Sequence, residues 1–315
     1  MKRLLIVILA ALFGAVAFGQ NGNFLLGIVS ISPAENNNAR FIKGATAEAE
    51  ALGWKVQVID AQGSADQANS AIQNLVTRRA GAIIDMVFPT TSLGAGLAAA
   101  ERARIPVGSW GGGSGRAVVA VNGSGGPMTI PVIDKMIADM GGKGSLLALT
   151  YHTGQVCRER EIELDKMLKD YPNITVTKNE VRIPGYFQDG AQYAAAWLAS
   201  HPAGNEPLAV WGCWDDPALG AISTLKQQNR HDVLVYGVNG NSDAIRSVRD
   251  GWMTATAFQQ STEEGKVMVQ TLKDAAEAMA AGKTFAPKSV EVPVILVTKD
   301  NVEQFIKDHP DVVGQ

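Results

Sequence analysis

Polar and aromatic side chains stand directly after several segments whose composition is typical of β-strands. An indole face can cover the apolar side of a ring or chain, and the amides of Asn and Gln offer donors and acceptors to hydroxyl groups. In open parallel sheets, ligands bind beyond the carboxyl ends of the strands, where such residues would meet. A binding site for a small molecule is therefore predicted from Asn36, Asn37, Asn38, Trp110, Trp214, Asp215, Asn239, Gln259 and Gln260.

Signatures of catalysis are missing from the sequence. Gly282-Lys283-Thr284 ends like a phosphate-binding loop, but Glu277 stands where the first glycine of that loop is required. The turn at 111–115 lacks the spacing of a dinucleotide fingerprint, and no Gly-x-Ser-x-Gly elbow occurs. We therefore expect no catalytic residue and no cofactor, with an enzyme as the alternative that measured turnover would support. Nor do we expect a metal site, because no second ligand stands at metal-binding spacing from His152, His201, His231 or His309.

Two adjacent carboxylates precede a proline, in Asp215-Asp216-Pro217. This pattern is typical of a helix N-terminus, where carboxylates cap free amides and suit the helix dipole. Capping is favoured over general acid or base chemistry, although one of the two, Asp216, is kept as a candidate ligand contact.

Strand-like runs alternate with segments of helical periodicity along almost the whole chain. The pattern opens with a strand at 24–30 and a helix at 36–52, and it closes with a strand at 290–297. It starts afresh after 122–126, where Gly and Ser cluster, so we place a crossover there. The sequence thus predicts an α/β fold of two similar Rossmann-like lobes, each a parallel sheet flanked by helices, with a cleft between them.

The first residues have the composition of an export leader. Lys2 and Arg3 form a positive end, and residues 4–18 are nearly all apolar or small. This run is shorter than the roughly 20 apolar residues that cross a bilayer. We therefore expect a cleaved signal peptide at 1–19 and an exported mature protein.

Composition and cysteine content limit which classes of partner and which covalent bonds the protein could have. The net charge of -3 leaves no basic excess to attract nucleic acid, and charged residues make up only 19% of the 315-residue chain. Cys157 and Cys213 are the only cysteines. In an oxidising compartment they are enough for one disulfide, and the alternative is two buried thiols that pack as small apolar residues.

Five short segments carry a more specific signal: Ile105-Pro106-Val107, Arg158-Glu159-Arg160, Asp215-Asp216-Pro217-Ala218-Leu219-Gly220-Ala221, Tyr236-Gly237-Val238-Asn239-Gly240 and Thr254-Ala255-Thr256-Ala257-Phe258-Gln259. With the order of elements and the leader, they resemble the type I periplasmic binding proteins of the ribose-binding class, over about residues 24–298. The resemblance implies a hinge of three crossing segments. It divides the chain into an N-terminal lobe of 20–122 plus 260–291 and a C-terminal lobe of 123–259 plus 292–315.

The resemblance also implies which residues touch the ligand: Asn36, Asn37, Asn38, Trp110, Gly111, Arg158, Tyr186 or Phe187, Trp214, Asn239 and Gln259. Sugar binders of the class usually carry Asp-Arg after the fourth strand and Asp at the position of Asn239, whereas this chain has Gly111, Gly112 and Asn239. Charge-assisted hydrogen bonds are about twice as strong as neutral ones. Losing two carboxylate acceptors therefore favours a polyol or modified sugar over a common pyranose or furanose, with a small aromatic or anionic compound as the alternative.

The same resemblance implies a periplasmic monomer that captures a small-molecule ligand and hands it to an ABC transporter permease in the inner membrane. A membrane sensor or chemoreceptor is the alternative partner. A ligand-gated repressor of related fold is excluded, because the leader stands where the DNA-binding helices would be.

Overall fold

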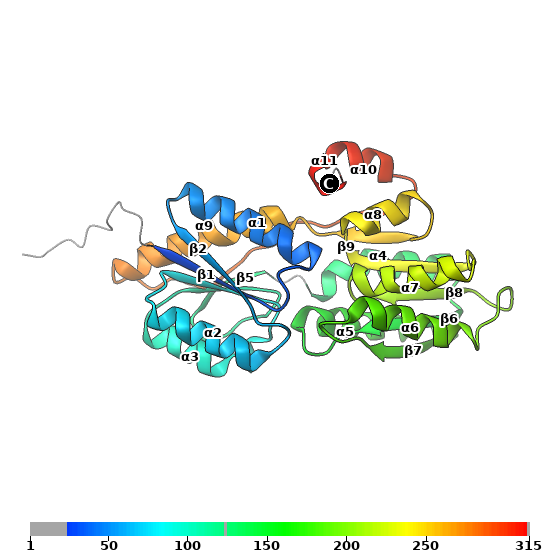
Figure 1. Cartoon of the computed structure of the whole chain (residues 1–315), viewed down its shortest axis with the longest axis horizontal. Coiled ribbons are helices and arrows are strands. Elements are labelled where there is room, and N and C mark those ends of the chain that lie inside the picture. The colour runs from blue at the N-terminus through cyan, green and yellow to red at the C-terminus, as the bar shows by residue number, and fades with distance from the viewer. Residues whose placement is uncertain (1–23, 123–124, 314–315) are drawn as a thin grey trace, which may run out of the picture.

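The computed structural model describes residues 24–122 and 125–313, which form two lobes lying side by side (Figure 1). Each lobe is built on a six-stranded sheet that is flanked by helices. The predicted α/β fold of two similar lobes is confirmed. The predicted signal peptide, residues 1–19, lies outside the described residues.

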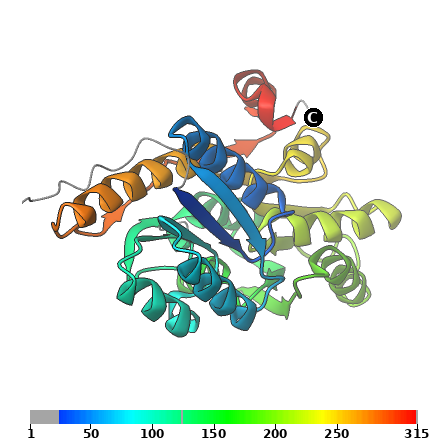
Figure 2. The same cartoon turned by 60° about the vertical axis from the view of Figure 1, so that its left-hand side comes forward.

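The first sheet has the strand order β11-β5-β4-β3-β1-β2, and its strands pair in parallel. Helices α1 and α9 lie side by side over one face, and α2 and α3 cover the other (Figures 1 and 2). The elements of this lobe are β1 (Leu25–Ser30), α1 (Asn36–Ala51), β2 (Lys55–Asp60), α2 (Ala65–Thr77), β3 (Ala82–Met86), η1 (Thr90–Ser92), α3 (Gly94–Arg102), β4 (Val107–Trp110), β5 (Val118–Asn122), α9 (Ser261–Ala280) and β11 (Lys288–Ser289).

The second sheet has the order β12-β10-β9-β8-β6-β7, in which only the β10–β12 pairing is antiparallel among the described strands. Helices α4 and α5 pack together, as do α6 and α7, while α8, α10 and α11 form a group near β12. The elements of this lobe are α4 (Gly126–Met140), β6 (Gly144–Thr150), α5 (Gln155–Leu168), β7 (Ile174–Glu180), α6 (Tyr186–Leu198), β8 (Leu208–Gly212), α7 (Asp215–Gln227), β9 (Val233–Asn239), α8 (Ser242–Arg249), β10 (Ala255–Phe258), β12 (Ile295–Thr298), α10 (Val302–Asp308) and α11 (Pro310–Val313).

The segment predicted as one last strand, 290–297, differs in the structure. β11 ends at Ser289 and pairs with β5 of the first sheet, whereas β12 begins at Ile295 and pairs with β10 of the second. Pro293 lies between them and has no N–H to donate to a sheet ladder. The chain therefore passes from one lobe to the other here instead of continuing as a strand.

Close helix packing fixes α1, whose N-terminal end faces the second lobe (Figure 1). A Cβ atom added at Gly44 of α1 would lie 1.9 Å from the carbonyl oxygen of Thr262 in α9. Only glycine permits this approach of two backbones. The first turns of α1 are therefore held in a set position relative to the cleft.

In the part of the chain that the structure describes, no helix combines the length and the hydrophobicity that a membrane span needs.

Candidate functional site

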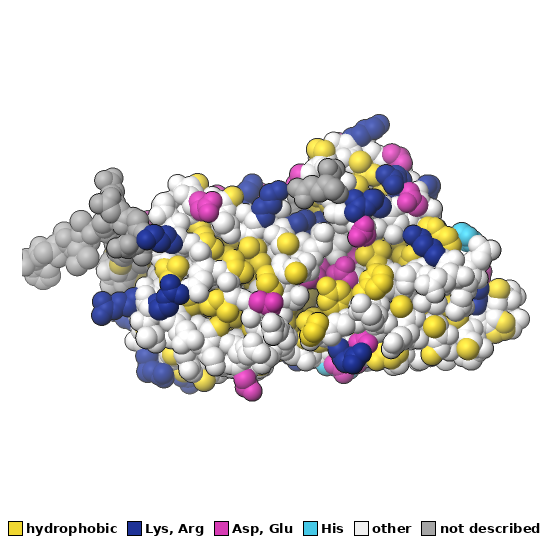
Figure 3. Space-filling model, in the orientation of Figure 1, with side chains coloured by type: hydrophobic (Ala, Val, Ile, Leu, Met, Phe, Trp, Pro, Cys, Tyr) yellow, Lys and Arg dark blue, Asp and Glu magenta, His cyan; other side chains and the backbone are white. Residues whose placement is uncertain are grey.

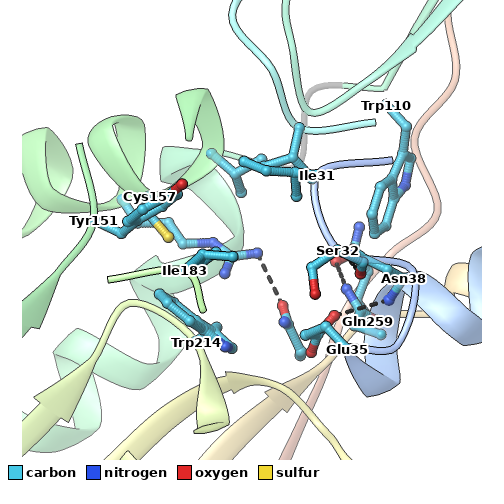
Figure 4. A pocket seen from close by; sticks show the side chains of 15 residues that line it. Ile31, Ser32, Glu35, Asn38, Trp110, Tyr151, Cys157, Ile183, Trp214 and Gln259 are labelled. Carbon is cyan, nitrogen blue, oxygen red and sulfur yellow. Dashed lines mark hydrogen bonds between the residues drawn. The ribbon is translucent and has the colours of Figure 1, made fainter. Parts of the chain in front are cut away.

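A cavity of about 50 Å³ lies between the two lobes (Figure 4). The lobes meet beside it, because Gln155 N donates a backbone hydrogen bond of 3.2 Å to Val87 O. The structure therefore shows the cleft in a closed arrangement. The first lobe lines the cavity from the segments that follow β1, β3 and β4, through Ile31, Ser32, Glu35, Asn37, Asn38, Val87 and Trp110.

The second lobe forms the opposite wall from the ends of β6 to β9 and the start of α5. Gln259 lies just beyond β10, where the chain passes between lobes. Parallel strands bring their carboxyl ends to one edge of a sheet, which is why residues distant in the sequence meet here. The residues of this wall are Tyr151, Val156, Cys157, Arg160, Ile183, Trp214 and Asn239.

Trp110 is the last residue of β4 and is held on two sides. Its Nε1 donates a 2.7 Å hydrogen bond to Glu264 Oε2, and its ring packs against Phe41 with centroids 4.6 Å apart. Burial raises the pKa of the Glu264 carboxyl group. Because its N–H is already used, Trp110 offers the cavity an apolar ring surface.

Trp214 follows β8 and is held in the same way. Its Nε1 donates to Asp216 Oδ2 at 3.0 Å, and the rings of Tyr151 and Tyr186 meet it edge-on at 6.0 and 5.5 Å. Burial raises the pKa of Tyr151 to about 12, so its hydroxyl stays neutral and remains a donor. The second tryptophan therefore also presents ring surface to the cavity.

Arg160 supplies a buried positive charge to the second-lobe wall. Its Nη1 donates to Cys213 O at 2.6 Å and its Nη2 to Asn239 Oδ1 at 3.1 Å. Burial lowers the pKa of the guanidinium group. The backbone of Asn239 has a φ of 114°, which is rare for a residue with a side chain and is often found at functional sites.

A chain of amides connects the first lobe to the crossing segment. Asn37 Nδ2 donates to Gln259 Oε1 at 2.8 Å, and Gln259 Nε2 donates to Glu264 Oε2 at 2.7 Å. Glu264 Oε2 therefore accepts hydrogen bonds from both Gln259 and Trp110. One buried carboxyl group thus orients two of the residues that line the cavity.

Glu35 brings a carboxyl group to the cavity that the sequence did not predict. Its Oε2 accepts from Asn38 N at 2.8 Å and caps α1, and its Oε1 accepts from Asn241 Nδ2 of the second lobe at 3.1 Å. The same Nδ2 atom donates to Asp216 Oδ2 at 3.2 Å, and Glu35 and Asp216 also hydrogen-bond to each other. Glutamate is not a preferred N-cap residue, so no pattern in the sequence indicated this position.

The structure brings together six of the predicted contact residues, all of which line the cavity: Asn37, Asn38, Trp110, Trp214, Asn239 and Gln259. Tyr186 and Asp216 lie behind Trp214 and support its ring. Asn36, Gly111 and Phe187 are not among the lining residues, and the side chain of Phe187 is 40% exposed.

Arg160 lines the cavity, whereas Arg158, the arginine predicted for the site, does not. Arg158 donates instead to His152 O at 2.8 Å. Residues two positions apart point to nearly opposite sides of a helix, because each residue turns it by about 100°. Arg160 shares the buried face of α5 with Val156 and Leu164, four positions before and after it, and this spacing is the signal that would have identified it.

Cys157 and Cys213 are free thiols in the structure, and they are in hydrogen-bond contact with each other. The sequence left a disulfide and two buried thiols open as alternatives, and the structure has the two side chains as buried thiols. Burial raises the pKa of the Cys213 thiol, which keeps it protonated and lowers its reactivity.

Residues 28–283 match the family described as periplasmic binding protein domain. The ribose import binding protein of Bacillus subtilis is 27% identical over 283 residues, which are 86% of this chain and 89% of that protein. The xylitol-binding protein of Mycolicibacterium smegmatis is 29% identical over 178 residues, which are 55% of this chain and 48% of that protein. Among solved structures, an ABC transporter solute-binding protein of Mycobacterium smegmatis with bound glycerol is similar at a TM-score of 0.76 and 25% identity, covering 90% of this chain and 96% of that one.

Proposed function

The chain belongs to the periplasmic binding protein domain family, and from this premise we propose that it captures a small sugar or polyol between its lobes for an ABC permease. The observation that carries the proposal is the cavity between the lobes, which takes its walls from both of them. A solute held by one lobe gains contacts to the other only when the cleft closes. Those additional contacts shift the balance between open and closed forms, and no covalent step is needed.

The polar groups of the cavity suit hydroxyl groups. Both indoles have their N–H groups engaged with carboxyl groups, so their rings are left to cover the C–H surface of a solute. Arg160, Asn38 and Asn239 offer donors and acceptors around that surface. Glu35 also provides a carboxyl group at the cavity, although the two carboxylates usual in related sugar binders are absent.

The room in the closed cleft favours a compact solute. A volume of about 50 Å³ is roughly four times the 10–15 Å³ that a cavity needs to hold one water molecule. Relatives include proteins named for ribose and for xylitol and a structure that holds glycerol. An anion would meet the carboxyl group of Glu35, and these relatives are named for sugars and polyols, so an uncharged polyol or small sugar is the better candidate.

The proposed location is the periplasm, with the predicted leader at 1–19 removed on export. The permease is preferred over a sensor or chemoreceptor as the partner, because the named relatives serve import and ABC transport. We propose capture without turnover, which solute recovered unchanged after incubation would establish. Loss of solute uptake on deletion of the gene would test the delivery step.

A thermal-shift screen followed by calorimetry tests the proposed ligand class. Glycerol, xylitol, ribose and myo-inositol form the first panel, and benzoate and succinate represent the aromatic and anionic alternatives. A compound that binds only the folded chain at 100 times its Kd adds about 2.7 kcal/mol to stability. Stabilisation by at least one polyol or sugar is expected. A shift with benzoate or succinate alone would overturn the proposed class.

A further inference from the structure

Arg40 makes contacts across the cleft without lining the cavity. It belongs to α1 of the first lobe, yet its Nη1 donates to Gly240 O at 2.9 Å and its Nη2 to Asn239 O at 2.6 Å, at the carboxyl end of β9. Its guanidinium carbon also lies 4.9 Å from the ring centroid of Phe258 in β10. Three of its contacts are therefore with the second lobe, while Asn37 is its partner within the first, at 2.9 Å.

The surroundings of Arg40 suit a charge that is buried when the lobes meet. Acidic groups from both lobes interact with it, namely Glu35, Glu264, Asp215 and Asp311. A guanidinium group presents donors in a rigid fork that suits paired oxygen atoms and stacks well on aromatic rings. When the lobes separate, water replaces the two carbonyl groups and the ring. The gain from these contacts is thus available only in the closed form.

Asn239 gives this contact a direct route to the binding site. Its carbonyl oxygen accepts from Arg40 and from Gln259 N at 3.1 Å, while its side chain reaches Arg160 at the cavity. Its φ of 114° is one that a residue with a side chain holds only where its surroundings enforce it. Closing the cleft therefore adds the guanidinium group of Arg40 as a donor to the carbonyl oxygen of Asn239, and this bond supports the unusual backbone conformation of Asn239.

We propose that Arg40 is a positioning residue that keeps the two lobes closed and holds Asn239 at the cavity without touching the solute. The proposal deepens the proposed function and rests on it in one respect, namely that the lobes open and close. Since Arg40 does not line the cavity but supports closure, its loss should weaken the binding of every accepted solute.

A cross-linking rate measures closure without any solute. A Cβ atom added at Gly63 of the first lobe would lie 3.7 Å from Cβ of Ile183 in the second, within the range of roughly 3.5–4.5 Å found in disulfides. The pair Gly63→Cys and Ile183→Cys is therefore placed in a chain that carries Cys157→Ala and Cys213→Ala. Oxidised glutathione, reduced in the exchange, forms the bridge, and mass spectrometry of the unreduced protein follows its rate.

Arg40→Gln should slow this cross-link about tenfold, as expected for the loss of one charge-assisted hydrogen bond. Arg40→Lys, which keeps the charge but not the fork, should restore part of the rate. Lys43→Gln is the matched control, because Lys43 is exposed on the same helix, and it should leave the rate unchanged.

An unchanged rate in Arg40→Gln would overturn the proposal, and a lower melting temperature with that unchanged rate would assign Arg40 a purely structural role. Equal slowing by Lys43→Gln would also overturn it, by showing an effect of net charge alone. Because no solute is added, failure of every panel compound to bind would refute the proposed function and leave this result standing.

Discussion

Affinity for the solute should fall as the pH rises, because closing the cleft buries two carboxyl groups against each other. Glu35 from the first lobe and Asp216 from the second hydrogen-bond to each other and share Asn241 Nδ2 as a donor. Figure 3 shows acidic side chains gathered where the lobes meet. Burial and then the charge of Glu35 raise the pKa of Asp216 well above its usual value. The closed form therefore keeps a proton that the open form, with Glu35 moved away, releases.

The size of the effect follows from proton linkage. Uptake of one proton on closing changes affinity by at most tenfold per pH unit, about 1.4 kcal/mol. The loss begins above the ordinary aspartate pKa of 3.8 and continues until the pH passes the raised value. The charge of Asp215 also raises the pKa of Asp216, but it does so in both forms because the two residues are adjacent in one lobe. Arg40 and Arg160, which both interact with Glu35, reduce the slope below this limit.

Calorimetric titration of the best compound from the panel at pH 5, 6, 7 and 8, at constant ionic strength, measures this slope. Repeating it in buffers of different ionisation enthalpy counts the protons taken up. Glu35→Gln keeps hydrogen-bonding atoms but removes the second carboxyl group, so the slope should flatten. Glu50→Gln, an exposed change on the same helix, should keep it. An affinity that does not depend on pH, or an equal slope in Glu35→Gln, would refute the reasoning.

Three further predictions concern single residues. Arg160→Gln should weaken binding about 100-fold by removing charge-assisted hydrogen bonds at the cavity, while Arg158→Gln should change it less than about threefold; equal calorimetric effects would contradict the placement. Burial raises the pKa of Asp215 to about 7, so the wild-type chain should lose up to about 4 kcal/mol of stability as the pH rises from 3.8 through 7. Asp215→Asn should remove that loss. Urea unfolding of both chains at pH 5 and 8 measures it, and an equal loss of stability in the two chains would contradict the prediction. Gly44→Ala should lower the free energy of unfolding by about 2 kcal/mol, because its Cβ would lie 1.9 Å from a carbonyl oxygen of α9. Gly94→Ala, with nothing within 4 Å of the added Cβ, is the control, and equal melting temperatures would disprove the clash.

The fold was predictable because apolar residues recur with the period of a helix or of a strand in each segment. The helix expected at 36–52 is α1 at Asn36–Ala51, and the strand expected at 24–30 is β1 at Leu25–Ser30. The last strand was not, since the break at Pro293 sends its two halves to different sheets. Alternation of apolar residues indicates that a segment pairs, but not with which sheet.

The site was predictable only where a strand end marks it. Trp110 and Asn239 end β4 and β9, so their position followed from the fold alone. The choice between Arg158 and Arg160 depends on the rotation of α5 about its axis, which is settled by packing across the lobe. Glu35 depends on a partner 206 residues away in the other lobe, and no local pattern indicates such a contact.

The contacts of the site divide into two sets that act at different times. Trp110 and Trp214 are oriented by carboxyl groups of their own lobes, Glu264 and Asp216, and Gln259 at the crossing segment is oriented by Glu264. Such contacts do not need the lobes to meet, so these surfaces are formed before the solute arrives, which lowers the entropy lost on binding. The bonds made by Arg40 and Asn241 cross the cleft, so under the proposed opening and closing they belong to the closed form alone. Changes in the first set should therefore alter which solute binds, whereas changes in the second should alter how long any solute stays.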